Sequence, residues 1–223
     1  MKVVITGTSR GIGLELTRQA LEAGHQVLAV ARDPQNATEL QKLAPKFPDA
    51  LKILAADVND PAGRARIVDT AGSWGAVDTL INNAGVYKKG VTEADFTESF
   101  RTNTISPYLL TLELLPLLKK GQSPKVISVS SLMGSVGNNS SGGSAAYRAS
   151  KAALNAIHKS LSIDEPWLTS FVMHPGWVQT DMGGTGATLS IPDSASGIWK
   201  VIHNAKPATS GHFLNYTGEE LTW

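Results

Sequence analysis

The sequence predicts a single domain, residues 1–223, with a doubly wound α/β fold: a parallel sheet of about seven strands with helices on both faces. Three observations support this. Short apolar runs alternate with helix-length segments along the chain, the runs are apolar on consecutive positions, and a glycine-rich turn follows the first run. Strands that are apolar on both faces suit a sheet covered on both sides. The fold class is therefore the Rossmann type.

The expected strands are apolar runs rich in Val, Ile and Leu. In chain order they are KVVITG (2–7), HQVLAVAR (25–32), LKILAADV (51–58), VDTLINNAG (77–85), KVISVSS (125–131), LTSFVMHPG (168–176) and GHFLNYTG (211–218). Helical patterns are expected between them, at about 11–24, 35–45, 61–74, 93–119, 145–165 and 193–204. The Gly- and Ser-rich segments 134–145 and 183–190 each follow a strand and precede a helix, so we interpret them as loops at the carboxyl edge of the sheet.

Composition excludes several classes of function. Twenty Lys and Arg against nineteen Asp and Glu leave a formal charge of +1 and no basic surface for a nucleic acid. There is no cysteine, which rules out disulfides and thiolate chemistry and suits a reducing cytoplasm, and the five histidines are scattered, so no metal site is expected. The first residues run directly into a strand, and no apolar stretch approaches about eighteen residues. We expect a cytoplasmic protein without a membrane partner.

The first strand is followed by TGTSRGIG, in which Gly7, Gly11 and Gly13 open a helix. Glycines let the backbone approach a pyrophosphate, while free N–H groups and the helix dipole face its negative charge. A glycine triplet can also be a tight turn, but the strand before it and the helix after it favour a phosphate cradle. The spacing, Gly-x-x-x-Gly-x-Gly, differs from the common dinucleotide fingerprint.

The end of the second strand distinguishes between two dinucleotides. Arg32 stands close to where a carboxylate would hold the ribose 2′-hydroxyl of NAD. Its planar guanidinium suits a 2′-phosphate, and Arg10 in the glycine loop could reach the same phosphate. Asp33 is followed by a proline, and we interpret it as a cap of the next helix. Either arginine alone could be solvated surface, but together they favour NADP(H) over NAD(H) as the cofactor.

The segment AAYRASKAALN (145–155) places Tyr147 and Lys151 four residues apart in an Ala-rich helix. Four residues is just over one helical turn, so the two side chains share a face. The pair alone is equally typical of a half-buried tyrosine beside a solvated lysine. Other motifs of the chain must decide between the two interpretations.

Taken together, these motifs resemble those of the classical short-chain dehydrogenase/reductase family, from the first strand to the last. TGTSRGIG resembles the glycine motif of that family, and NNAG (82–85) its structural motif after the fourth strand. The other matches are Asn103 in FRTNTISPY, Ser131 after KVISVS, the Tyr-x-x-x-Lys pair and HPGWVQTDM. The wording around 138–155 and the terminal LNYTGEELTW further resemble small carbonyl-reductase-like members related to the Sniffer and C-factor proteins.

The resemblance implies a catalytic set. NADPH would deliver hydride to a carbonyl carbon while Tyr147 gives a proton to its oxygen. A free tyrosine has a pKa of about 10, and the positive charge of Lys151 would stabilise the phenolate and bring that pKa toward neutrality. By resemblance, Lys151 also holds the nicotinamide ribose, Ser131 orients the carbonyl, and Asn103 anchors a water that passes protons to Lys151.

The resemblance also implies a cofactor site. Asn83, Ala84 and Gly85 would line the adenosine ribose, Asp57 and Val58 would meet the adenine, and Thr180 would bind the nicotinamide carboxamide. For NNAG the alternative is a purely structural turn. The full expected set is Gly7, Ser9, Arg10, Gly11, Ile12, Gly13, Arg32, Asp57, Val58, Asn83, Ala84, Gly85, Tyr147, Lys151, Pro175, Gly176, Val178 and Thr180.

Two departures from the family pattern bear on the site. Ser131 and Tyr147 are sixteen residues apart, more than is usual in the family, so Ser130 competes with Ser131 as the catalytic hydroxyl; we favour Ser131, the last residue of its strand. The segment after HPGWVQTDM is shorter than the substrate-binding lid of many relatives, which leaves the substrate unidentified. Four apolar residues are candidates either for the pocket wall or for plain packing: Met133, Trp177, Met182 and Trp199.

Two other functions compete with the enzyme. A non-catalytic NADPH-binding sensor or signalling protein would use the same fold, but loss of Tyr147 or Lys151 would favour it, and both are present. Epimerases and dehydratases of the extended branch have another glycine spacing and an added substrate domain. Family members commonly pair through helices that here span about 93–119 and 145–165. Because some small carbonyl reductases are monomeric, the resemblance leaves a homodimer, a homotetramer and a monomer open.

Overall fold

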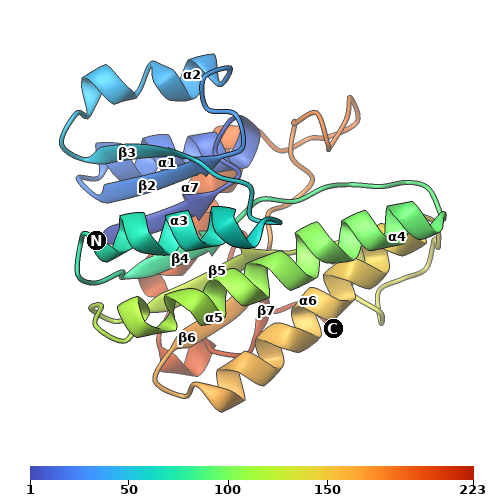
Figure 1. Cartoon of the computed structure of the whole chain (residues 1–223). Helices are drawn as coiled ribbons and strands as arrows, with labels where there is room; N and C mark the ends of the chain where they lie inside the picture. The colour runs from blue at the N-terminus through green and yellow to red at the C-terminus, as the bar shows by residue number, and fades with distance from the viewer.

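The computed structural model describes residues 1–223 and contains one sheet of seven parallel strands. The strands are β1 (Lys2–Thr6), β2 (Gln26–Ala31), β3 (Leu51–Ala55), β4 (Thr79–Asn82), β5 (Lys125–Val129), β6 (Thr169–His174) and β7 (Phe213–Asn215). Their order is β3-β2-β1-β4-β5-β6-β7, so the direction of progression reverses between β1 and β4. This confirms the doubly wound fold and each of the seven expected strands (Figure 1).

Helices fill the connections between strands. They are α1 (Gly11–Glu22), α2 (Thr38–Gln41), α3 (Pro61–Gly72), α4 (Glu93–Phe100), α5 (Ser106–Leu118), α6 (Ala145–Asp164) and α7 (Ile191–Asn204). Short 3₁₀ turns are η1 (Ala44–Lys46), η3 (Leu132–Gly134) and η4 (Pro207–Thr209), and η2 (Arg101–Ile105) is a π-helical segment between α4 and α5.

The core lies in two layers, one on each face of the sheet. Successive strand residues point to opposite faces, so Val3 and Ile5 belong to one cluster and Val4 to the other. The first cluster lies between the sheet and helices α1 and α7, and the second lies under α3 and α5 (Figure 1). Because both faces are covered, the strands are apolar on consecutive positions, as the sequence predicts.

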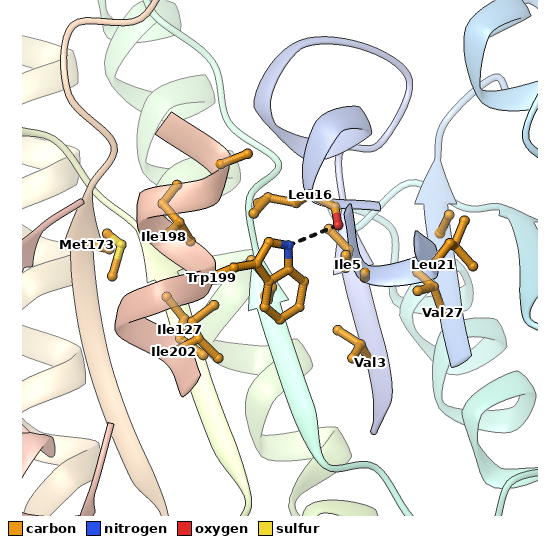
Figure 2. Packing of buried hydrophobic residues seen from close by; sticks show 14 of the residues in the cluster. Val3, Ile5, Leu16, Leu21, Val27, Ile127, Met173, Ile198, Trp199 and Ile202 are labelled. Carbon is orange, nitrogen blue, oxygen red and sulfur yellow. Dashed lines mark hydrogen bonds between the residues drawn. The ribbon is translucent and has the colours of Figure 1, made fainter. Parts of the chain in front are cut away.

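Trp199 joins α7 to α1 in the first cluster. Its indole lies among aliphatic side chains of the sheet and of both helices (Figure 2), and it is only 6% exposed. The indole N–H donates to the carbonyl of Leu16 over 3.1 Å. A buried indole needs a partner for this donor, and the contact supplies it. Trp199 is therefore core packing, and the structure excludes it from the wall of a pocket.

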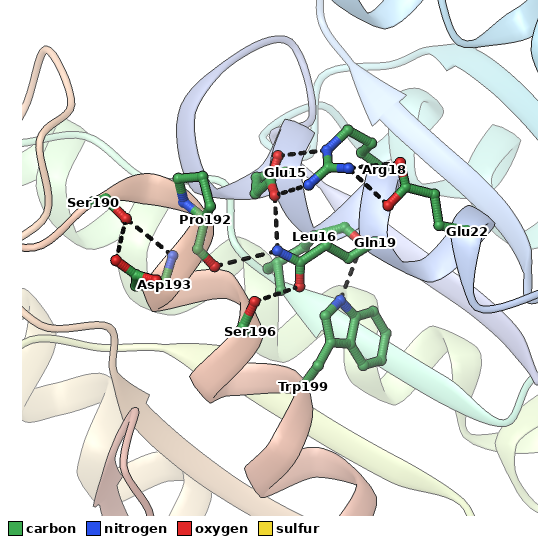
Figure 3. Close-up of polar contacts among 10 residues, drawn as sticks. All are labelled: Glu15, Leu16, Arg18, Gln19, Glu22, Ser190, Pro192, Asp193, Ser196 and Trp199. Carbon is green, nitrogen blue, oxygen red and sulfur yellow. Dashed lines mark hydrogen bonds and ion pairs between the residues drawn. The ribbon is translucent and has the colours of Figure 1, made fainter.

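Polar contacts at the surface also hold α7 on α1 (Figure 3). The Gln19 amide donates to the Pro192 carbonyl over 3.2 Å and accepts from the Ser196 hydroxyl over 3.3 Å. Within α1, Arg18 pairs with Glu15 and Glu22. These contacts fix the helix that begins at the glycine loop, so the loop is attached to a rigid element.

The expected helix at 35–45 is mostly wrong. Only Thr38–Gln41 is α-helical, followed by the 3₁₀ turn η1, because Pro45 has no N–H with which to continue the helix. Asp33 does not cap this helix. Its carboxylate accepts from the backbone N–H of Asn36, and the N-cap is Ala37 without a side-chain bond.

The expected helix at 93–119 is divided in three. It begins with a capping box in which Thr92 and Asp95 bond each other, and residues 101–105 then widen into the π-helical segment. Pro107 follows that segment, and it cannot close the α-helical bond to the carbonyl four residues before it, which is that of Asn103. The irregular turn thus falls at a residue that was expected to be catalytic.

Candidate active site

A cleft of about 870 Å³ lies at the carboxyl edge of the sheet, where the strand order reverses between β1 and β4. Open α/β sheets hold their ligands at this position. The cleft is lined by the glycine loop, the ends of β2 to β5, residues of α6 and the loop after β6. The expected site residues that line it are Gly7, Ser9, Arg10, Gly11, Ile12, Gly13, Arg32, Asp57, Val58, Asn83, Ala84, Gly85, Tyr147, Lys151, Pro175 and Thr180.

The glycine loop is packed too tightly for other residues. Gly7 has a φ of +70°, and a Cβ on it would lie 2.8 Å from the Ala84 Cα. A Cβ on Gly13 would lie 2.3 Å from the Gly7 carbonyl oxygen. The Asn83 amide donates to the carbonyls of Thr6 and Gly7 over 2.9 and 3.0 Å, which fixes the loop from the next strand. The Asn-Asn-Ala-Gly segment therefore supports the phosphate cradle as well as lining the cleft.

The two arginines differ in their surroundings. Arg10 is exposed and forms an ion pair with Asp181, its Nε lying 3.2 Å from the carboxylate. Arg32 is exposed and lines the same cleft without a salt bridge. Exposed pairs contribute little to stability, so a phosphate could displace Asp181 from Arg10 at small cost. Asp181, which sequence reasoning missed, is the only acid paired with either of the two arginines.

Tyr147 and Lys151 lie on one face of α6, and both are buried, at 7% and 5% exposed. The Lys151 ammonium lies 5.8 Å from the centre of the Tyr147 ring and donates to the Val129 carbonyl over 2.7 Å. The Tyr87 ring packs edge-on against Tyr147, with the ring centres 4.7 Å apart. The Tyr87 hydroxyl is hydrogen-bonded to Ser144, just before α6 begins, so Tyr87 braces the helix that carries the pair.

Burial controls the protonation of both groups. It raises the pKa of Tyr147 to about 12, with a smaller opposing effect from a hydrogen bond with Ser131 and a smaller reinforcing one from Tyr87. Burial also lowers the pKa of Lys151 to about 8. In the free protein, then, Lys151 does not bring the pKa of Tyr147 toward neutrality as expected. The phenolate is poorly solvated, and the ammonium is itself destabilised by burial.

The two candidate serines have separate partners. The Ser130 hydroxyl is buried and donates to the Asn155 side chain over 2.6 Å. Ser131 is partly exposed, its hydroxyl accepts from the Met133 N–H, and it has a small lowering effect on the pKa of Tyr147. Ser130 lines the cleft and Ser131 does not, although the Ser130 hydroxyl is committed to α6. Ser131 is not the last residue of its strand as expected, because β5 ends at Val129 and Ser131 caps the 3₁₀ turn η3.

Asn103 lies in the π-helical segment, 1% exposed, outside the lining of the cleft. Its side chain accepts from the Val86 N–H and donates to the Val86 carbonyl, both over 2.9 Å. It also donates to the Ser150 hydroxyl over 3.0 Å. Both amide hydrogens are thus used within the protein, and the side chain ties the end of the Asn-Asn-Ala-Gly segment to α6.

The loop after β6 brings only part of the expected set to the cleft. Pro175 and Thr180 line it, whereas Gly176 and Val178 do not. Val178 is buried and pairs with Leu189, so its side chain supports the loop from within. Met182 lines the cleft and is 47% exposed, while Trp177, 57% exposed, donates to the Gly183 carbonyl. Of the apolar candidates, Met182 is thus the one in contact with the cleft.

Some site residues were missed by sequence reasoning. Tyr87 stands two positions after the Asn-Asn-Ala-Gly segment, and that position was the only signal that could have pointed to it. Asn59, after the expected adenine residues, also lines the cleft. Neither carries a motif of its own, because their roles come from contacts with distant residues.

The residues present fit a dinucleotide phosphate. The tight cradle around Gly7 and Gly13 leaves no room for side chains, and a Cβ on Gly11 would meet only Thr180 at 3.5 Å. The helix that starts there has no acid in its first turn, which leaves its positive end free to face an anion. The two arginines at the rim add positive charge.

The helices and the charged side chains also bear on membrane and metal binding. The helices are all too short or too polar to span a membrane. No three His, Asp or Glu side chains are grouped in a way that could hold a metal ion.

Comparison with known proteins identifies relatives. The family model described as short chain dehydrogenase matches residues 1–188. The C-signal protein of Myxococcus xanthus is 46% identical over 157 residues, which is 67% of this chain and 94% of that protein. The NADPH-bound carbonyl reductase from chicken fatty liver has a TM-score of 0.94 at 36% identity, covering 100% of this chain and 98% of that one. The carbonyl reductase Sniffer of D. melanogaster has a TM-score of 0.95 at 34% identity, covering 100% of this chain and 99% of that one.

Proposed function

The chain belongs to the short-chain dehydrogenase/reductase family, and on that premise we propose that it is an NADP(H)-dependent oxidoreductase. It would interconvert an aldehyde or ketone and an alcohol by hydride transfer, with Tyr147 as the acid and base. The observation that carries the proposal is the buried Tyr147 phenol, one helical turn from the buried Lys151 ammonium, in a cleft that begins at a phosphate cradle. The chicken relative is a carbonyl reductase with NADPH bound, which supports the same assignment.

Different residues of the chain would bind the cofactor, orient the carbonyl and transfer the proton. Residues of the glycine loop would hold the pyrophosphate, and Asn83 to Gly85 the adenosine ribose. When bound, the nicotinamide supplies the hydride. Ser131 would orient the carbonyl, Tyr147 would give its hydroxyl proton to the carbonyl oxygen, and Lys151 would hold the nicotinamide ribose. The negative charge that develops on the oxygen is the reason why two hydroxyl donors are needed there.

Reduction is the direction we propose. A carbonyl oxygen needs a protonated donor, and burial raises the pKa of Tyr147 to about 12, so the phenol is neutral at physiological pH. Asn103 would feed the site with protons through a water. Because both of its amide hydrogens are bonded within the protein, we place that water at its main-chain carbonyl, to which Pro107 cannot donate.

The preference for NADPH would come from the rim of the cleft. Arg32 carries no salt bridge, and Arg10 is held near the opening by Asp181. A 2′-phosphate between the two guanidinium groups would replace that exposed ion pair with stronger charge-assisted bonds. NAD(H) lacks this phosphate and would not form these bonds with the two arginines.

The test is oxidation of NADPH and NADH against a panel of aldehydes, ketones and quinones. We expect turnover with NADPH that falls at least about a thousandfold in Tyr147→Phe, because the variant loses the proton donor but keeps the ring. Arg32→Asp should move the cofactor preference toward NADH. Arg66→Asp, at an exposed position outside the cleft, is the matched control and should keep the preference. Turnover that survives in Tyr147→Phe would overturn the role of the phenol.

A second function is favoured by one observation. The Myxococcus relative, at 46% identity, is named as a signal. We therefore keep a non-catalytic NADPH-binding sensor or signalling protein as the alternative. Tight NADPH binding measured by fluorescence, without turnover of any carbonyl in the panel, would support the alternative and reject the enzyme.

Location and assembly complete the proposal. The lack of cysteine suits a reducing compartment, and we propose the cytoplasm, which cell fractionation would test. We propose a homodimer or homotetramer through α4, α5 and α6, in line with the family resemblance. Sedimentation equilibrium would separate these from a monomer.

A further inference from the structure

Asn59 stands on the loop after β3, directly beyond the two residues expected to meet the adenine. Its backbone N–H donates to the Asp57 carboxylate over 2.9 Å, and the residue lines the cleft with Asp57 and Val58. Its side chain is not simply solvated, because its amide nitrogen and its amide oxygen are both hydrogen-bonded to the segment between α4 and α5. The proposed reaction assigns it no part.

The Asn59 side chain bonds a residue within the π-helical segment η2 and the residue that directly follows this segment. Its amide nitrogen donates to the Thr102 hydroxyl over 2.9 Å, and its amide oxygen accepts from the Ser106 hydroxyl over 2.7 Å. The Arg101 guanidinium donates to the Asn59 carbonyl over 2.9 Å. Thr102 and Ser106 are buried, at 7% and 2% exposed. A single residue thus spans the segment with three bonds.

The segment between those contacts carries Asn103. The Asn103 side chain is hydrogen-bonded to the Val86 backbone and to the Ser150 hydroxyl. The Ser150 hydroxyl in turn donates to the Tyr147 carbonyl over 2.7 Å. Asn103 and Ser150 are almost completely buried, so these bonds do not compete with water. The position of Asn103 therefore affects the position of α6, the helix that carries Tyr147.

A π-helical turn needs support from outside the helix. It contains one residue more than an α-helical turn, it is rare, and it occurs mostly at functional sites. Relaxation to an α-helix would rotate the side chains before the segment by roughly 100° relative to those after it, the angle per α-helical residue. Asn103 would then lose its bonds to Val86. Bonds that fix Thr102 and Ser106 at the same time oppose that relaxation.

We propose that Asn59 is a positioning residue that holds the π-helical segment in register, and through it places Asn103 and the Tyr147 helix. It would also tie the adenine end of the cleft to the reacting end. The positioning role concerns the free protein. Its consequence for turnover rests on the proposed function.

Hydrogen exchange in the free protein tests the positioning role without any cofactor. We compare wild type with Asn59→Ala, with Thr102→Val, which keeps the volume but loses the hydroxyl, and with Thr102→Ser, which keeps it. The exposed Asn204→Ala is the matched control. Asn59→Ala and Thr102→Val should each reduce the protection of the Val86 amide and of the amides of residues 101–106 against exchange by at least about tenfold. Thr102→Ser and the control should leave this protection unchanged. Unchanged protection in Thr102→Val would overturn the proposal, even where Asn59→Ala failed to fold.

Kinetics with NADPH test the consequence. A misplaced Asn103 should lower kcat by roughly 10- to 100-fold in Asn59→Ala, while the Kd for NADPH changes less than about threefold. The double variant with Asn103→Ala should be no slower than Asn103→Ala alone, because both changes act on the same group. A raised Kd with unchanged kcat would make Asn59 an adenine contact and reject the proposed effect of its positioning role on turnover.

The two proposals fail separately. If the wild type turned over no carbonyl, the enzyme assignment would fall, and the exchange data would still decide whether Asn59 holds the π-helical segment. If the wild type turned over carbonyls while protection in Thr102→Val stayed as in the wild type, the enzyme would stand and the positioning role would fall.

Discussion

Lys151 is a buried ammonium whose only hydrogen bond within the protein is to the Val129 carbonyl. Burial costs the charged form free energy, which is why its pKa falls from 10.5 to about 8. The unfolded chain binds more protons than the folded one between those values. The cost to stability is therefore complete below about pH 8 and disappears as the pH rises toward 10.5. The role that we propose for Lys151 would explain why the chain carries a residue that lowers its stability.

This predicts that Lys151→Met stabilises the free protein at pH 7. The removed charge accounts for about 3 kcal/mol, and the lost hydrogen bond offsets about 1, so the free energy of unfolding should rise by roughly 2 kcal/mol. Urea unfolding at pH 7 and pH 10 would measure it, and the gain should shrink at pH 10. Lys159→Met, at an exposed position on the same helix, is the control. A Lys151→Met protein less stable than wild type at pH 7 would contradict the account.

The raised pKa of Tyr147 predicts different pH profiles for carbonyl reduction and for alcohol oxidation. With its pKa near 12, the phenol stays protonated from about pH 6 to 9, so Tyr147 itself should add no pH dependence to kcat/KM for carbonyl reduction there. Alcohol oxidation needs the phenolate and should rise with pH over the same range. Steady-state assays in both directions check this. A reduction rate that rises with pH would mean that the proton donor is another group.

At the scale of elements, the interface between α1 and α7 fixes the phosphate cradle. The cradle begins α1, and Trp199 of α7 holds α1 by packing and by the bond to Leu16 (Figure 2). The polar contacts of Gln19 add little energy because they are exposed (Figure 3). The stability of this interface thus comes chiefly from buried apolar side chains, among them the Trp199 indole.

The predicted result is a graded loss on truncation of Trp199. Trp199→Phe should lower the free energy of unfolding by about 1–2 kcal/mol, because it loses the hydrogen bond and part of the volume. Trp199→Ala should lower it by about 3–5 kcal/mol through the cavity it leaves. Trp177→Phe, at an exposed indole, should change it by less than about 0.5 kcal/mol. Equal effects at the two tryptophans in denaturant unfolding would refute the packing argument.

At the scale of the whole molecule, a buried histidine and a half-buried one make the fold sensitive to acid. His158 lies between the Ser128 and Ser170 hydroxyls, at 2.6 and 2.9 Å, and burial lowers its pKa from 6.5 to about 3. Burial lowers the pKa of His174 to about 4. The folded state binds fewer protons than the unfolded chain between these values and 6.5. Stability is therefore complete above about pH 6.5 and falls as the pH drops below it.

The expected loss between pH 7 and pH 5 is about 2 kcal/mol for each of the two histidines. Together this is a large part of the roughly 5–15 kcal/mol that stabilises a typical domain. Thermal unfolding at both pH values would measure it. His158→Gln cannot take up the proton, so its stability deficit relative to wild type should narrow by about 2 kcal/mol at pH 5. A deficit that stays constant would show that His158 does not titrate on unfolding.

Much of the fold and part of the site could be predicted, because the signals are local. Consecutive apolar positions indicate buried strands whatever surrounds them, and all seven were found. Tyr147 and Lys151 share a helix face because of the helical period alone, and the glycine loop lies between a strand and a helix that are its neighbours in the chain. The weak point was the helix at 35–45, where Pro45 overrode a helical pattern.

The sequence by itself therefore determined the succession of strands and helices along the chain, the family and most of the residues that meet at the sheet edge. Only the tertiary structure decided that Ser130 bonds Asn155 of α6, that Asp181 pairs with Arg10, and that Asn59 spans a π-helical segment around Asn103. It also decided that the pKa of Tyr147 rises where the motif suggested a fall. The physical reason is the same in each case. Partners far apart in the chain and the degree of burial set these properties, and neither is encoded in local spacing.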